Sequence, residues 1–214
     1  MIYEPVDSFE YKGFTVEIYP DFDPPSPREW DNLGTMVCWH RRYILGDEHD
    51  FTTPDDFAEW AKGKKLIIKP LYLIDHSGLS MNTHGYNCCD PQGWDWGQVG
   101  WIYVTYEDAL RRFGRKRMSR KLRRRIERIL ENEVRTYDAY LSGQVYGFVV
   151  KLGDKELDSC FGFYGEDGLK DLEMEAKGLI DAYIRRKYKE HAERVKAWIK
   201  HKVPLIYRHS LRLI

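Results

Sequence analysis

Seven segments of this chain alternate apolar and polar residues or form short apolar runs, and each pattern predicts a β-strand. The segment from Phe14 to Tyr19 alternates and stops at Pro20, as a half-buried strand does. The segment from Leu66 to Asp75 is apolar almost throughout, which is typical of a buried strand, and Pro70 predicts a bend in it. The other predicted strands are Thr35–His40, Gly78–Asn82, Val99–Val104, Val145–Lys151 and Glu156–Phe163.

Helix signals lie between and after these strands. Thr53, followed by Pro54 and two acids, predicts the N-cap of a short helix that reaches about Ala61. Thr105 predicts the cap of a second short helix, and Ser119 the cap of a longer one that ends near Leu141. Apolar residues of the longer helix fall on one face, which we expect to be buried. They are Leu122, Ile126, Ile129, Leu130, Val134, Tyr137 and Leu141.

A third long pattern, from about Asp167 to His201, predicts a C-terminal helix with a candidate kink at Gly178. Its core candidates are Leu172, Leu179, Ile180, Tyr183, Ile184, Val195, Trp198 and Ile199. Together the elements predict an α+β fold, a mostly antiparallel sheet with several helices packed on one side. We expect one domain over residues 1–214, with an acidic part at about 1–63, a basic helical insert at about 105–141 and the helix at about 167–201.

Charge changes this picture, because it is unevenly placed although the chain has no net charge. Between Arg111 and Arg128, eleven of eighteen positions are Lys or Arg, and only Glu127 is acidic. The first sixty residues hold fourteen Asp and Glu against four Lys and Arg. A fold tolerates so much like charge when an anion lies opposite it. That anion is either a partner or the chain's own acidic region, and both remain open.

The basic segment also opposes the dipole of its own helix. Arg120 and Lys121 lie in the first turn, where the positive dipole end repels each by a few tenths to about 1 kcal/mol. Such a local conflict points to function. Acidic loops and Trp-rich loops are further candidates for binding. The candidate partner-binding residues are Arg111, Arg112, Arg115, Lys116, Arg117, Arg120, Lys121, Arg124, Arg125, Arg128, Asp21, Asp23, Asp31, Trp94 and Trp96.

Cysteine and histidine spacing predicts neither a metal site nor a cofactor. Cys38 and Cys160 stand alone and Cys88 is adjacent to Cys89, which suits neither a disulfide framework nor a CxxC zinc motif. The other possible ligands also lack the spaced pairs that zinc requires. They are His40, His76, His84 and Asp90. The first ten residues contain three acids and no apolar run, so we expect no membrane segment, no membrane partner and a cytoplasmic protein.

Catalytic motifs are equally weak. Asp75, His76 and Ser77 are consecutive, whereas a working triad is assembled across distant segments, so we interpret them as a strand end and a turn. Cys160 with Asp158 lacks a nearby His. We therefore expect no catalytic residue. One alternative stays open, an enzyme with its site in the loops Trp94–Gly97 and Asp158–Tyr164.

Three motifs carry a resemblance. WDWGQVGWIYV starts at Trp94, YDAYLSGQVYGF at Tyr137 and LDSCFGFYG at Leu157. With them the region from about Leu66 to Gly165 resembles a family of small proteins carried by bacteriophages and mobile elements. The resemblance brings no catalytic residue with it. It implies an accessory role in which the protein binds host machinery, including restriction and CRISPR nucleases.

These observations favour a non-enzymatic protein of a phage or mobile element that binds and inhibits a host protein in the bacterial cytoplasm, such as a defence complex that targets nucleic acid. This is a host-defence inhibitor of the antirestriction or anti-CRISPR type. The first alternative is a nucleic-acid-binding accessory protein that uses the basic segment. A pI near 7.0 and the lack of any recognised nucleic-acid-binding motif count against this alternative.

Overall fold

The computed structural model describes residues 4–87, 92 and 94–204. In that part the chain has an α+β fold with two antiparallel four-stranded sheets and a long C-terminal helix, which confirms the predicted fold class. The chain packs as two compact units. Unit 1 consists of Met1–Tyr19, Phe148–Cys160 and Lys170–Ile214, and unit 2 of Pro20–Gly147 and Phe161–Leu169. The single predicted domain stays a prediction, because packing units need not be separate domains.

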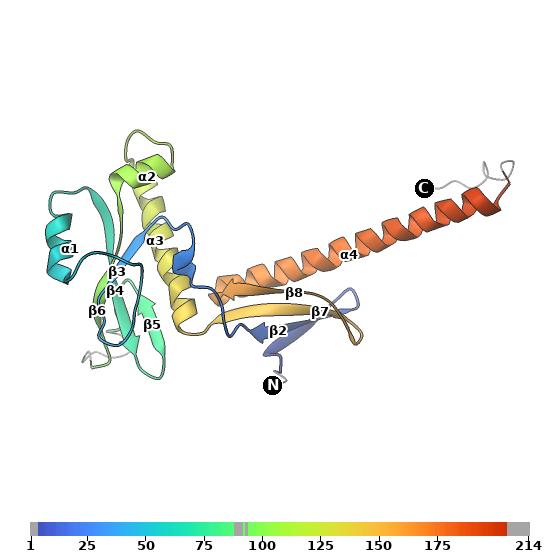
Figure 1. The fold of residues 1–214 in the computed structure, drawn as a ribbon, viewed down its shortest axis with the longest axis horizontal. Helices are drawn as coiled ribbons and strands as arrows, with labels where there is room; N and C mark the ends of the chain where they lie inside the picture. The colour runs from blue at the N-terminus through green and yellow to red at the C-terminus, as the bar shows by residue number, and fades with distance from the viewer. Residues whose placement is uncertain (1–3, 88–91, 93, 205–214) are drawn as a thin grey trace. The chain divides into compact units, whose positions relative to one another are not determined.

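Unit 1 is built on the sheet with strand order β1-β2-β7-β8. Strand β1 was not predicted, and it pairs with β2 across a two-residue turn at Lys12 and Gly13. Both turn residues have positive φ, 52° and 81°, as a tight hairpin turn requires. The first half of the C-terminal helix covers this sheet (Figure 1). The elements are β1 (Asp7–Tyr11), β2 (Phe14–Pro20), β7 (Val145–Leu152), β8 (Lys155–Tyr164) and α4 (Gly165–Lys202).

The core of unit 1 lies between the sheet and α4. Leu172, Ala176 and Ile180 are buried on the helix, as are alternate residues of β2 and β7. Polar contacts at the edge of this core include the 2.7 Å ion pair between Lys12 and Asp181. The predicted core role of Trp198 is wrong, because this side chain is 61% exposed, far along α4.

Unit 2 is built on the sheet with strand order β3-β6-β4-β5. Gly100, in β6, must be glycine, because a Cβ there would come within 1.9 Å of the carbonyl oxygen of Val37 in β3. The elements are η1 (Pro27–Glu29), β3 (Thr35–Cys38), α1 (Pro54–Ala61), β4 (Leu66–Asp75), β5 (Leu79–Asn82), β6 (Trp96–Thr105), α2 (Tyr106–Arg112) and α3 (Arg120–Leu141). All predicted boundaries in both units agree with the structure to within three residues.

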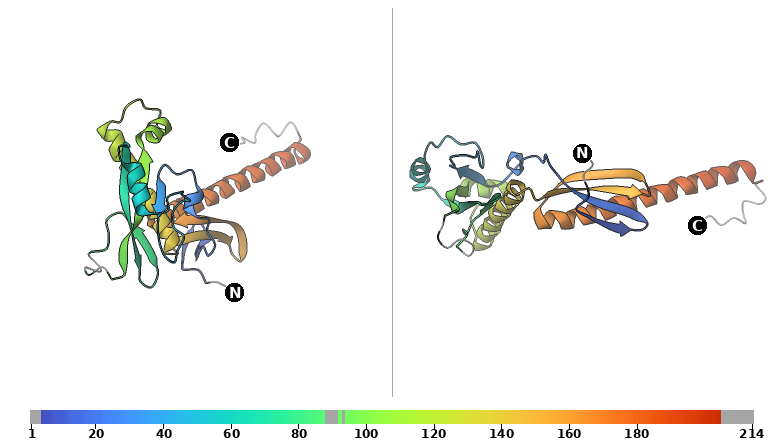
Figure 2. Two further views of the ribbon diagram at one scale, coloured as in Figure 1. Left: turned by 60° about the vertical axis from the view of Figure 1, so that its left-hand side comes forward. Right: turned by 90° about the horizontal axis from the view of Figure 1, so that it is seen from below.

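Helices cover both faces of the unit 2 sheet (Figures 1 and 2). On one face α3 packs its buried Ile126, Leu130 and Val134 against Ile102 and other inward residues of the strands. On the other face α1 places Phe57 on Trp101, with ring centroids 5.3 Å apart. Helix α1 therefore lies opposite α3, whereas the sequence predicted that the helices pack on one side of the sheet.

Candidate functional site

The basic residues between α2 and the middle of α3 form one exposed surface. All ten predicted partner-binding cations of this segment are exposed. We define the basic surface as the eight cations from the α2–α3 loop onward. They are Arg115, Lys116, Arg117, Arg120, Lys121, Arg124, Arg125 and Arg128.

The packing of α3 sets the direction in which these side chains point. The Ser119 hydroxyl caps the helix by accepting a 3.1 Å hydrogen bond from the Leu122 amide. Ile126 and Leu130 are fully buried in the core, which fixes the rotation of the helix about its axis. At 100° per residue the α3 cations span an arc of about 140° on the opposite side. No acid lies in the first turn, so the predicted conflict with the dipole is present.

Few of the basic residues are neutralised within the chain. Arg111 pairs with Asp108 at 2.7 Å, and Arg123 pairs with Glu127 at 2.9 Å. Arg125 stacks over the Phe113 ring at 5.1 Å, a contact that leaves its charge uncompensated. Eight cations of the segment form no ion pair with any acid in the described part of the chain. They are Arg115, Lys116, Arg117, Arg120, Lys121, Arg124, Arg125 and Arg128.

The acidic amino-terminal region does not cover the basic surface. Among the described residues, one ion pair joins the segment Arg111–Arg128 to an acid of the first sixty residues, that of Arg112 with Asp31 at 2.7 Å. The Asp31 side chain is 79% exposed, so this pair is screened and weak. Asp21 accepts a hydrogen bond from the amide of Asp23, and neither acid forms an ion pair with a described residue. Internal docking therefore does not explain the segment.

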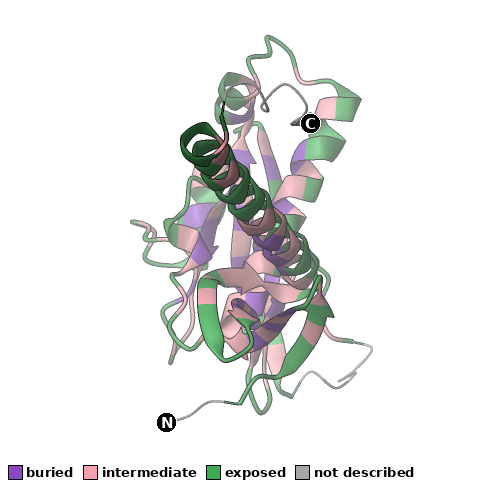
Figure 3. Cartoon of the chain, turned by 90° about the vertical axis from the view of Figure 1, so that its right-hand side faces the viewer, coloured by how far each residue is buried: buried purple, intermediate pink, exposed green. Residues whose placement is uncertain are grey.

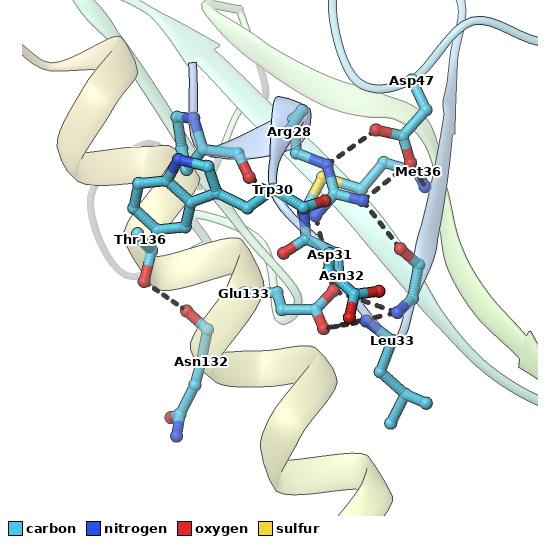
Figure 4. Close-up of polar contacts among 12 residues, drawn as sticks. Arg28, Trp30, Asp31, Asn32, Leu33, Met36, Asp47, Asn132, Glu133 and Thr136 are labelled. Atoms are coloured by element: carbon cyan, nitrogen blue, oxygen red, sulfur yellow. Dashed lines mark hydrogen bonds and ion pairs between the residues drawn. The ribbon is translucent and has the colours of Figure 1, made fainter. Parts of the chain in front are cut away.

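One acid of that region is used instead in a buried network that includes Arg28 (Figure 4). The Arg28 guanidinium, 5% exposed, makes two hydrogen bonds of 2.7 and 2.8 Å to Asp47. It also approaches Glu133 of α3 at 3.4 Å. Glu133 in turn accepts from the amides of Leu33 and Gly34 at 2.7 and 3.1 Å. The network therefore ties the loop before β3 to the middle of α3.

Burial and charge pairing oppose each other in this network. Burial acts to lower the pKa of Arg28, but the hydrogen bonds and charge of Asp47, with the charge of Glu133, raise it overall. Burial raises the pKa of Glu133, against the lowering by its amide donors and by Arg28. No sequence signal pairs residues 28 and 133; the only hint is an isolated Arg inside an acidic, Pro-rich loop.

The tryptophans predicted to bind a partner lie elsewhere in unit 2. Trp94 is 80% exposed, and Trp96 is half-buried against Tyr72, with ring centroids 5.6 Å apart. Strand β6 runs for ten residues from Trp96 to Thr105, a length of about 30 Å, before α2 begins. The structure therefore does not bring these tryptophans together with the basic surface. Cys88, Cys89 and Asp90, considered as metal ligands, lie outside the described residues.

The catalytic alternatives receive no support from the described geometry. His76 pairs with Asp95 at 2.9 Å on an exposed turn, and Ser77 has a φ of 58°, as expected for a turn after β4. The enzyme alternative placed its site in a loop at Asp158–Tyr164, but these residues belong to strand β8, in agreement with the predicted strand Glu156–Phe163. Burial raises the pKa of the Cys38 thiol to about 12, which leaves it a poor nucleophile.

Grooves in unit 2 are open, and their acids serve structural roles. The groove between β5 and α3, about 510 Å³, is lined by His84, Glu131 and Asp138, among others. Asp138 accepts a 2.8 Å hydrogen bond from the Met81 amide and so holds β5 on α3. Within the described residues no cluster of His, Cys, Asp and Glu is arranged to hold a metal ion.

Comparison of the chain with protein-family models, curated proteins and solved structures finds no significant match. None of the helices in the described part of the chain is both long and apolar enough to cross a bilayer.

Proposed function

We propose that this protein is a non-enzymatic accessory protein of a phage or mobile element that binds nucleic acid, through contacts of its basic surface with backbone phosphates. One observation carries the proposal. Eight exposed cations gather on the α2–α3 loop and the first half of α3 and have no ion-pair partner among the described residues. Their mutual repulsion is relieved when a polyanion approaches.

The chemistry of the side chains favours phosphate. Most of the eight are Arg, whose guanidinium forms paired hydrogen bonds with phosphate oxygens. The cations on α3 lie one helical turn apart, at positions 120, 124 and 128, and so form a row along the helix. Side chains that contact phosphates position a protein on nucleic acid and carry no sequence information, so we expect binding without sequence preference.

The neutral total charge of the chain does not oppose this proposal. Fields of exposed charges decay over about 8 Å at physiological ionic strength, so the local surface matters more than the sum. Asp47, which carries one of the amino-terminal charges, is bound to Arg28 and is unavailable to the basic surface. The sequence analysis counted the pI near 7.0 and the lack of a recognised binding motif against nucleic acid, and the local surface answers the first of these objections.

A salt titration tests the proposal. The full chain is titrated into a fluorescent 20-base-pair duplex at 50 to 200 mM salt, and affinity is measured by anisotropy. With about six phosphate contacts, log affinity falls against log salt with a slope near −5, so affinity drops about a thousandfold over this range. Several unrelated duplex sequences give the same result.

Two variants with the same charge change locate the site. The α3 reversal variant carries Arg120→Glu, Lys121→Glu, Arg124→Glu and Arg125→Glu. The α4 reversal variant carries Arg185→Glu, Lys189→Glu, Arg194→Glu and Lys196→Glu, at positions that are also exposed. We expect the first to abolish measurable binding and the second to retain most of it. Equal losses, or no binding by the natural chain at 50 mM salt, would contradict the proposal.

A second candidate function, inhibition of a host protein, is favoured by the acidic loop of residues 20–32. Phe22 and Trp30 are 67% and 47% exposed there, beside Asp21 and Asp23. Exposed aromatics next to acids are typical of protein interfaces, and carboxylates can occupy the basic groove of a nucleic-acid-processing enzyme. Binding to such an enzyme that is lost on Trp30→Ala, and kept in the α3 reversal variant, would favour this function over the first.

A further inference from the structure

The second half of α4 has a surface that the described strands and helices do not cover. Beyond Ile184 every residue up to Lys202 is exposed except Val195 and Ile199, which are half-exposed. Figure 1 shows this part of the helix continuing past the ends of the unit 1 strands, and Figure 3 shows its turns mostly in the colour of exposed residues. We call residues 185–202 the distal helix.

The apolar residues of the distal helix form a stripe. At 100° per residue five of the six apolar residues lie within about 120° of arc, which also contains His191 and Lys202, and Ala197 lies on the back of the helix. Tyr188 and Trp198 belong to the stripe and are 73% and 61% exposed. The members of the stripe are Tyr188, Ala192, Val195, Trp198 and Ile199.

Most of this stripe lies off the core face of α4. The buried residues Leu172, Ala176 and Ile180 point in a direction roughly 110° away from the centre of the stripe, and of its five members only Trp198 shares the direction of Ile180. The sheet that covers the first half of α4 therefore faces a different side of the helix from the other four members. A different partner is needed to cover them.

Charge identifies the kind of partner. The distal helix holds eight Lys or Arg and two Glu, a net charge of +6. Lys189 and Lys196 lie along one border of the stripe and Lys187 and Arg194 along the other, whereas both acids, Glu190 and Glu193, lie on the back of the helix. From residue 194 to residue 214 the sequence contains six Lys or Arg and no acid.

These features exclude a second copy of the same helix, because two segments of charge +6 repel each other along both borders of the stripe. The phosphates of a nucleic acid would pair with the cations but would leave the apolar stripe between them exposed to water. An anionic bilayer surface uses both, because a helix lying in its plane buries the stripe among acyl chains while both basic borders reach the headgroups. Trp and Tyr are favoured at that boundary.

We propose that the distal helix attaches the protein to the surface of a bilayer that contains anionic lipid. The helix lies in the plane of the interface, with Trp198 and Ile199 inserted and Glu190 facing the water. This attachment is peripheral, and it replaces the sequence-based expectation that membranes have no part in the function. It is independent of the basic surface on α3.

Vesicle co-sedimentation of the full chain tests this proposal. The vesicles are phosphatidylcholine alone, or phosphatidylcholine with 30% phosphatidylglycerol. We expect binding to the mixed vesicles only, and weaker binding as salt rises. Ile199→Asp should lower the partition coefficient about tenfold or more, because a charge then replaces an inserted apolar side chain. Ala197→Asp adds the same charge on the back of the helix and should lower it about threefold or less.

Tyr188→Asp provides a second test on the stripe, and circular dichroism checks that each variant retains its helix. No binding to mixed vesicles, equal binding to both vesicle types, or equal effects of Ile199→Asp and Ala197→Asp would overturn the proposal. The proposal would also be overturned if the protein bound soluble poly-glutamate but not vesicles, and if Ile199→Asp weakened that binding. This result would indicate an acidic protein partner. The α3 reversal variant should bind vesicles normally, so the two proposals can fail separately.

Discussion

Reversing the charge of Arg120, Lys121, Arg124 and Arg125 should remove nucleic acid binding without unfolding the protein. None of the four side chains is in an ion pair with the described residues, and all four are exposed. A glutamate at position 120 or 121 is attracted by the positive end of the α3 dipole, whereas the present Arg120 and Lys121 are repelled by it. That change contributes about 1 kcal/mol at each of two positions.

One contact opposes this gain. Arg125 loses its stacking over Phe113, which contributes about 0.5 to 1 kcal/mol at an exposed site. The remaining cations nearby, such as Arg117 and Arg128, attract the new carboxylates instead of repelling their neighbours. The balance is a net stabilisation of about 1 to 2 kcal/mol at low salt. For a chain of this length that corresponds to a rise of roughly 2 to 6 °C in melting temperature.

Thermal unfolding followed by circular dichroism at 20 mM and 1 M salt measures this balance. Because the gain is electrostatic and exposed, most of it should disappear at 1 M salt, where the Debye length is about 3 Å. A fall of more than about 3 °C at low salt would refute the reasoning. It would show that these cations pair with acids of the chain in solution and that the basic surface is a structural device.

Three further changes probe the scaffold behind the surface. Leu130→Ala, at a fully buried position of α3, should cost about 2 to 5 kcal/mol in urea unfolding, and a cost below about 0.5 kcal/mol would mean that the assigned face is wrong. Arg28→Met leaves the half-buried Asp47 and Glu133 without the cation between them and should cost about 3 kcal/mol at pH 7. Burial already raises the pKa of Glu133, so the ionised carboxyl disfavours folding as pH rises through that pKa. The loss of unfolding free energy caused by Arg28→Met should therefore be smaller when urea unfolding is repeated near pH 4. Cys38, whose thiol pKa is raised to about 12, should react with iodoacetamide at pH 8 far more slowly in the native chain than in urea.

Local signals in the sequence were sufficient for most elements. Thr53 and Asp56 form a capping box whose two hydrogen bonds are 3.2 and 2.8 Å, so the start of α1 depends on residues three positions apart. The face of α3 followed from the spacing of its apolar residues, four of which, including Ile126 and Leu130, are buried. In both cases the information lies within one or two helical turns.

The features that the sequence analysis missed depend on contacts between residues that are far apart in the chain. Strand β1 has acids and half-exposed residues, and it is a strand because β2 pairs with it across the turn at Lys12 and Gly13. Trp198 follows the same apolar periodicity as a core residue, yet periodicity indicates only that a face is apolar and not what covers it. Arg28 and Glu133 are more than a hundred residues apart, and nothing local to either predicts the pair.

The same limit applies to the total charge of the chain. Equal numbers of acids and cations suggest that the basic segment is compensated, but compensation requires proximity and not equal counts. Asp56 caps α1, Asp47 is bound to Arg28 and Glu17 pairs with Lys151 at 2.6 Å, so each of these three acids has another partner. Asp31 reaches the edge of the segment through Arg112 and no further among the described residues. Asp31→Asn should therefore strengthen nucleic acid binding by only about twofold at 50 mM salt. A tenfold gain in affinity would show that this acid shields far more of the basic surface than its single ion pair implies.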